Sequence, residues 1–170
     1  MRKTMNYFSP DDIDDIAAAE KIEELVSIAL SVLDRMPKPV CWVGGPMTTG
    51  LRTNEDNKER LRQTILRFKE QGATVFNYLP LQKKAMDILR REFGDEQLLR
   101  DQEHQLQERL RDELYAPIFE SGKINELRIM PQSGASFNVQ WMRGFARGKG
   151  ITIKHIPEEL VPKLKKSAVK

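Results

Sequence analysis

Short apolar runs alternate with helical segments along this chain, and this alternation constrains the fold more than any other feature. The clearest run is PVCWVGG at 39–45, a continuous apolar stretch that is typical of a central parallel strand covered on both faces. Three further runs are expected to be strands: ATVFNYLPL at 73–81, INELRIMP at 124–131 and ITIKHI at 151–156. Strands joined through helices by short links favour a parallel sheet with right-handed crossovers. The sequence therefore predicts an α/β fold, a three-layer Rossmann-like (flavodoxin-like) parallel sheet with an added N-terminal helix.

The segments between these runs have apolar residues at helical spacing and are expected to be helices. One long helix is expected from Pro10 to the MPKP segment, with Ser9 as its N-cap and proline at the first helical position. The segment at 95–114 is heavily charged around a thin seam of leucines, so we expect a solvated surface helix there, with pairing to another helix as the weaker alternative. The remaining expected helices cover 55–71, 82–92 and 137–147.

Composition indicates a globular protein of ordinary domain size. Of the 170 residues, 39% are hydrophobic and 31% are charged. We expect an N-terminal helical extension over 1–38, an α/β domain over 39–157 and a basic C-terminal tail over 158–170. No apolar run approaches the roughly 18 residues of a membrane helix. A secretory signal is not evident, and the one cysteine excludes an internal disulfide, so a cytoplasmic location is expected.

The charge distribution bears on the expected partners. The net charge of +3 sits largely in KLKKSAVK at the C-terminus, where no aromatic residues interleave with the lysines. Such a run is typical of a solvated end, so neither a nucleic acid nor a membrane is expected as the partner.

Two loops of small residues are the candidate functional segments. Ligands bind parallel sheets at the carboxyl ends of strands, near the point where the strand order reverses. GGPMTTG at 44–50 and PQSGAS at 131–136 each follow an expected strand and lead towards a helix, whose N-terminus favours anions. The alternative is that both are ordinary turns. The candidate ligand-binding residues are Gly44, Gly45, Pro46, Met47, Thr48, Thr49, Asn54, Tyr78, Ser133, Gly134, Ala135 and Ser136.

Several other kinds of site are excluded by the residues present. Gly45 and Gly50 have the spacing of a P-loop, but Leu51 and Arg52 follow where that motif requires Lys and then Ser or Thr. No Cys/His cluster indicates a zinc site, and we expect no metal or cofactor. His155, at the end of the last expected strand, is assigned a structural or surface role.

Two motifs resemble a known family. VCWVGGPMTTG is similar to the opening of nucleoside 2-deoxyribosyltransferase-like proteins, in which the first strand runs into a GP loop that surrounds the nucleoside; an uncharacterised neighbouring family begins with a strand ending in GPM. SGASFNVQWMRGFARGKGI resembles a later segment of the family, and TVFNYLPL occupies the place of its second strand. The resemblance covers roughly 39–153. It implies a small-molecule nucleoside or nucleotide as the partner, and transfer or hydrolysis of an N-glycosidic bond as the chemistry.

The nucleophilic glutamate of that family has no counterpart at the matching positions. A carboxylate serves there because it forms and later releases a glycosyl ester. Alignment on GFARGK puts the nucleophile's position at Met142, and alignment on SGAS puts it at Asn138; neither side chain performs this chemistry. For the family's second acidic residue the candidates are Glu120, Asn125 and Glu126.

Three functions therefore stay open. The protein is a nucleoside deoxyribosyltransferase or nucleotide N-glycosidase with a displaced carboxylate, a catalytically inactive nucleotide-binding module, or an interaction protein that forms a homo-oligomer through its N-terminal helix.

Overall fold

A computed structural model describes residues 7–46, 54–94 and 100–163. Within them the chain forms an α/β fold in which helices flank a three-stranded parallel sheet, so the predicted fold class is confirmed at this level. The contacts divide the chain into two units. The sheet unit contains the described residues of Cys41–Val75 and Asn125–Lys170, and the helical unit contains those of Met5–Val40 and Phe76–Ile124. The N-terminal helices share a unit with a later segment of the chain.

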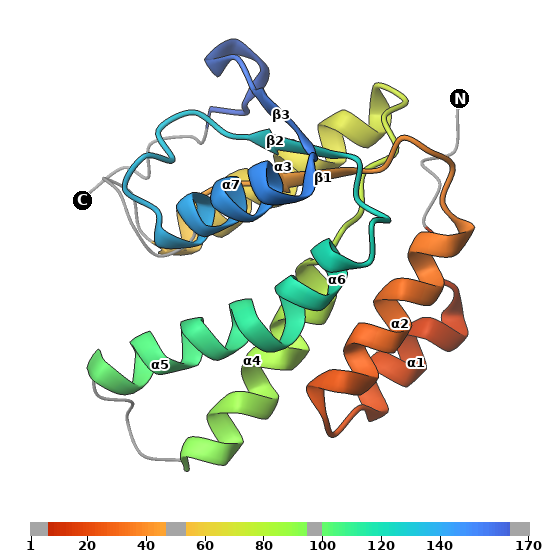
Figure 1. Ribbon diagram of the computed structural model, residues 1–170, viewed down its shortest axis with the longest axis vertical. Coiled ribbons are helices and arrows are strands. Elements are labelled where there is room, and N and C mark those ends of the chain that lie inside the picture. The colour runs from red at the N-terminus through yellow and green to blue at the C-terminus, as the bar shows by residue number, and fades with distance from the viewer. Residues whose placement is uncertain (1–6, 47–53, 95–99, 164–170) are drawn as a thin grey trace, which may run out of the picture. The chain divides into compact units, whose positions relative to one another are not determined.

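The sheet unit is built on short parallel strands (Figure 1). They are β1 (Cys41–Gly44), β2 (Glu126–Ile129) and β3 (Thr152–His155), in the spatial order β1-β2-β3. Helix α3 (Asn54–Glu70) follows β1, and α7 (Phe137–Lys149) connects β2 to β3. A short 3-10 helix, η2 (Glu158–Leu160), ends against α3, where Arg67 donates to the Leu160 carbonyl at 3.1 Å.

The two helices cover opposite faces of this sheet. The Arg128 guanidinium on β2 lies 5.0 Å from the centroid of the Phe68 ring on α3. Arg128 is in register with Val43, and the next residue, Gly44, faces the other side because side chains alternate along a strand. A Cβ placed on Gly44 would lie 3.2 Å from the Met142 sulfur of α7. Helix α3 therefore packs on one face and α7 on the other.

The predicted strand over 73–81 is wrong except at one residue. Val75 forms a single parallel bridge with Cys41, whose N–H donates to the Thr74 carbonyl at 2.8 Å. Helix α4 (Leu79–Phe93) begins within the predicted strand. Pro80 lies in the first turn of α4, a position that proline fits because its missing N–H costs nothing there.

The helical unit contains α4 and the helices of two other segments. They are α1 (Pro10–Ala18), α2 (Ile22–Arg35), α5 (Arg100–Leu110), a π-helical turn η1 (Arg111–Tyr115) and α6 (Ala116–Glu120). Its core includes side chains that are fully buried, among them Leu25, Leu33, Phe76, Leu81, Leu89, Tyr115 and Phe119. Every helix in the described ranges is too short or too polar to span a lipid bilayer.

The first predicted helix is two helices, because a local cap competes with helix continuation. The Glu24 carboxylate accepts hydrogen bonds from the backbone N–H groups of Glu20 at 2.7 Å and Lys21 at 3.0 Å. These bonds satisfy amides at the start of α2, which would otherwise lack partners. Ala19 is extended, with ψ of 133°, and ends α1.

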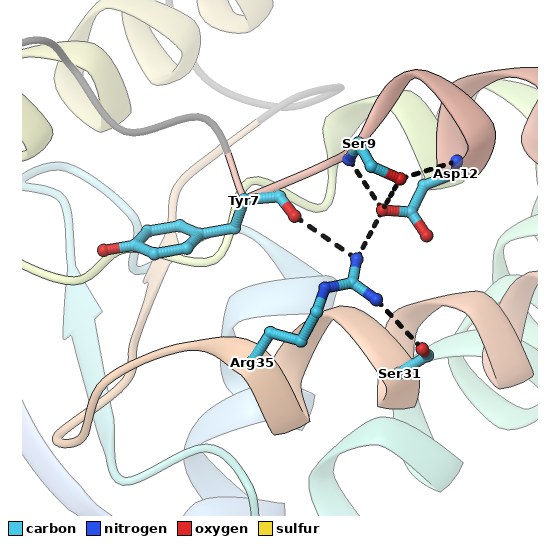
Figure 2. Close-up of polar contacts among 5 residues, drawn as sticks. All are labelled: Tyr7, Ser9, Asp12, Ser31 and Arg35. Atoms are coloured by element: carbon cyan, nitrogen blue, oxygen red, sulfur yellow. Dashed lines mark hydrogen bonds and ion pairs between the residues drawn. The ribbon is translucent and has the colours of Figure 1, made fainter.

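The predicted N-cap of the first helix is confirmed and belongs to a larger polar cluster (Figure 2). The Ser9 hydroxyl accepts from the Asp12 N–H at 3.1 Å, and the Asp12 carboxylate accepts from the Ser9 N–H at 2.7 Å. Arg35 of α2 pairs with the same carboxylate. Its guanidinium also donates to the Tyr7 carbonyl at 3.4 Å and to the Ser31 hydroxyl at 3.1 Å. The cluster therefore ties the start of α1 to the end of α2.

The charged segment at 95–114 is not the solvated helix that was predicted. Leu106, Leu110 and Leu114 are all 0% exposed. Helix α5 packs against α4, and η1 packs against α2, so the leucine seam belongs to the core of the helical unit. Leu99 lies outside the described residues.

Candidate functional site

The ends of β1 and β2 lie side by side. Gly44 is in register with Ile129, and the Met130 N–H donates to the Gly44 carbonyl at 2.8 Å. Both strands run in the same direction, so the described start of the first loop and the whole PQSGAS loop leave the same edge of the sheet. We call this edge, with the segments 44–46, 130–136 and 155–156, the carboxyl edge.

The chain pairs on both sides of β1, with β2 on one side and the single residue Val75 on the other. The bridge between Val75 and Cys41 lies on the side of β1 away from β2, because the β2 side of Cys41 is already paired with Glu126. The chain therefore moves from β1 to one side, and then returns past β1 to β2 and β3 on the other. In open α/β sheets such a reversal opens a crevice outside the carboxyl ends of the strands.

Two methionines fill the inner side of the first loop. A Cβ placed on Gly45 would lie 2.5 Å from the Met130 sulfur, and one placed on Gly44 would lie 3.2 Å from that of Met142. Both methionines are buried, as are Gly45 and Pro46. The glycines therefore allow the backbone to approach the thioethers closely. Met47, Thr48 and Thr49 lie outside the described residues, and the side chain of Asn54 is also not described.

The serines of the second loop are used to build the loop itself. The Ser133 hydroxyl donates to the Met130 carbonyl at 2.7 Å. The Ser136 N–H donates to the Ser133 carbonyl at 3.1 Å, and the Ser136 hydroxyl accepts from the Val139 N–H at 3.4 Å as the N-cap of α7. Both side chains are buried, whereas Gly134 and Ala135 are exposed. The loop thus presents backbone, and not hydroxyl groups, to its surroundings.

The two positions aligned with the family nucleophile differ in their surroundings. Met142 is 3% exposed and faces the sheet beside Gly44. Asn138 is half-buried in the first turn of α7. The structure places no carboxylate at either position.

The candidate acids lie away from the carboxyl edge or in the other unit. Glu126 begins β2, at the opposite end of the strand from the loops. It accepts from Lys154 at 3.0 Å and Arg128 at 3.2 Å, and these hydrogen bonds, with Lys154 the larger contributor, lower the pKa of its carboxyl group. The Glu126 carboxylate therefore pairs with basic side chains of β2 and β3. Glu120 is exposed at the end of α6, in the helical unit, and Asn125 immediately precedes β2.

Tyr78, for which the sequence allows either stacking on a base or a core or rim position, lies in the core of the helical unit. It is 1% exposed, and its ring meets that of Tyr115 edge-on with 5.8 Å between centroids. Of its two predicted roles, the core role matches this packing.

Helix α3 carries buried polar residues besides the candidate ligand-binding residues named above. Its C-terminal end leads to Val75 beside the start of β1, so its N-terminal end lies towards the carboxyl edge. Asn57 is 3% exposed, Arg60 is 5% exposed and Thr64 is 0% exposed. They share one face of the helix with the apolar core positions, and polar groups on such a face are the signal that could have identified them. Asp56 is half-buried next to them.

Comparison of the sequence with protein-family models, with curated proteins and with solved structures gave no match.

Proposed function

We propose that this protein binds a nucleoside or nucleotide at the carboxyl edge of its sheet. The observation that carries the proposal is the passage of the chain from β1 to the bridge at Val75 on one side and then to β2 on the other, with a glycine-rich segment leaving β1 and the PQSGAS loop leaving β2. A crevice where the chain changes side in this way is the usual ligand site of an open parallel sheet. The resemblance of both loops to nucleoside 2-deoxyribosyltransferase-like proteins supplies the ligand class.

The finer fold assignment belongs to the same proposal. When the segments are numbered along the chain and Val75 is counted as the second, their spatial order across the sheet is 2-1-3-4. This is the order of a flavodoxin-like sheet. The packing of α3 and α7 on opposite faces supports a three-layer, Rossmann-like unit. We assign the α1–α2 segment as an addition to that fold.

Binding is tested by ligand-induced thermal stabilisation with 2′-deoxynucleosides and their 5′-monophosphates. A ligand at 100 times its Kd adds about 2.7 kcal/mol to the free energy of unfolding. Replacing the exposed Ala135 by Trp is expected to fill the crevice and abolish the shift. Ala18→Trp, at an exposed position of the helical unit, is the matched control. Stabilisation of A135W equal to that of the wild type would place the ligand elsewhere.

Cleavage or transfer of an N-glycosidic bond is the second candidate function. It is favoured by one observation, the half-buried Asp56 in the first turns of α3, beside buried Asn57 and Arg60. This candidate function assigns to the Asp56 carboxylate the role of the glutamate that is missing at the Met142 position. Chromatography of reactions with deoxynucleosides and deoxynucleoside monophosphates would detect free base.

If the protein is such an enzyme, Asp56→Asn should stop the release of free base. Glu55→Gln, at the exposed neighbouring position, is the control and should release base as the wild type does. Ligand binding by the wild type without any free base would assign the protein as a binding module without catalysis.

A further inference from the structure

Two basic side chains, Arg143 and His155, face each other at the carboxyl edge. An Nη2 nitrogen of Arg143 on α7 lies 3.3 Å from Nε2 of His155. His155 ends β3 and is in register with Ile129, which is in register with Gly44, so all three lie in one row across the strand ends. Adjacent strands are about 4.8 Å apart, so His155 lies roughly 10 Å from Gly44. One nucleotide spans such a distance.

This pair has no acidic partner among the described residues. The ion pairs of the described chain include neither Arg143 nor His155. Helix α7 carries Arg143, Arg147 and Lys149 and no acidic residue. By contrast, Lys154, the residue before His155, faces the other side of the sheet and is paired with Glu126 at 3.0 Å. Within the described part of the chain, no carboxylate pairs with the basic side chains of α7 or with His155.

Besides Nη2, which contacts His155, the Arg143 guanidinium has a donor that is not used. Its Nε–H is buried and finds no hydrogen-bond acceptor within the described residues. Buried donors are nearly always satisfied, by protein, water or ligand. Nε and Nη2 form one edge of the guanidinium fork, the edge that binds phosphate oxygens in a bidentate manner.

We propose that Arg143 and His155 form a phosphate-binding pair, so that the ligand of the carboxyl edge is a nucleoside phosphate and not a free nucleoside. This inference rests on the proposed function. In the free protein, the Arg143 guanidinium and the His155 ring are within hydrogen-bond distance of each other. A bound phosphate accepts hydrogen bonds from Arg143 and from the His155 ring. The exposed backbone of Gly134 and Ala135, ahead of α7, lies at the same edge and favours an anion there.

The test is calorimetric titration of the full chain with the four common 2′-deoxynucleosides, their 5′-monophosphates and inorganic phosphate. We expect the monophosphates to bind about tenfold or more tightly than the nucleosides, as charge-assisted hydrogen bonds contribute. Arg143→Gln and His155→Ala should each remove most of this ratio. Arg147→Gln, with the same charge change one turn further along α7 at an exposed position, should keep it.

His155 is exposed, so His155→Ala keeps the test valid if Arg143→Gln does not fold. Equal affinity of the wild type for nucleosides and monophosphates would overturn the phosphate pair while leaving the proposed function intact. An equal loss in R147Q and R143Q would also overturn it, because only general charge would be acting. Binding of inorganic phosphate through Arg143, with nothing added by sugar and base, would support the pair and overturn the proposed function. No binding of any nucleoside, monophosphate or inorganic phosphate would overturn both.

Discussion

Single residues at the carboxyl edge have sharply different tolerance for change. A Cβ on Gly45 would lie 2.5 Å from the Met130 sulfur, whereas one on Gly134 would meet nothing within 4 Å. Both glycines belong to the loops that the sequence selected, but only the first is fixed by packing. Overpacking a buried site costs about 1–3 kcal/mol.

We therefore expect Gly45→Ala to lower the free energy of unfolding by about 1–3 kcal/mol, and Gly134→Ala to change it by less than about 0.5 kcal/mol, as measured by urea denaturation. In a Met130→Ala background the cost of Gly45→Ala should shrink, because the clashing atom is gone. The same cost in both backgrounds would refute this account of the glycine.

Asp12 gives a prediction about acid stability at the residue scale (Figure 2). Desolvation opposes its ionisation, but hydrogen bonds from Ser9 and the pairing with Arg35 outweigh it and hold its pKa below the ordinary value of 3.8. A carboxyl group with a lowered pKa stabilises the folded state above that ordinary value, and this contribution is lost as the pH falls through the folded-state pKa.

Asp12→Asn is expected to cost about 1–2 kcal/mol at pH 7, and the gap between variant and wild type should narrow below about pH 4. Urea titrations at pH 7, 5 and 3 measure this. Asp14→Asn, at an exposed position of the same helix, is the control and should match the wild type throughout. A gap that stays constant down to pH 3 would contradict the assigned pKa direction.

At the scale of elements, the burial of α5 gives a direct test. Its charged sequence predicts a solvated helix, whereas Leu106 and Leu110 are 0% exposed. Truncating a buried leucine to alanine costs about 2–5 kcal/mol. We expect Leu110→Ala to fall in this range by chemical denaturation. Leu66→Ala, at a residue 38% exposed on α3, should cost under about 1 kcal/mol. Similar small losses of unfolding free energy at both positions would indicate that α5 is a solvated surface helix after all.

At the scale of the whole molecule, the helical unit is assembled from two distant segments. Helices α1 and α2 pack with α4, α6 and η1, and α2 contributes Leu25, Ala29 and Val32, all 0% exposed. Deleting the residues before Met36 should therefore unfold the rest of this unit as well. Circular dichroism should show a loss of helix well beyond the deleted residues. A truncated chain that keeps cooperative melting and the helix content of α4–α6 would show that the N-terminal segment is an independent addition.

Local sequence signals predicted the elements whose causes are local. Ser9 and Pro10 mark a helix start because side-chain capping and a fixed proline φ act within one turn. The apolar run at β1 and the helix over 137–147, observed as Phe137–Lys149, follow from periodicity in the same way. The helix break before α2 was missed because it depends on one carboxylate, Glu24, competing for two backbone amides.

The sequence by itself determined that the chain forms parallel strands joined by helices, and that two small-residue loops leave strand ends. Only the tertiary structure decided which residues meet there. Strand order, the fate of the 73–81 segment, the burial of the α5 leucines and the approach of Arg143 to His155 depend on contacts between residues far apart in the chain. Periodicity and capping describe at most a few neighbouring turns, so the packing of distant segments fixes these features.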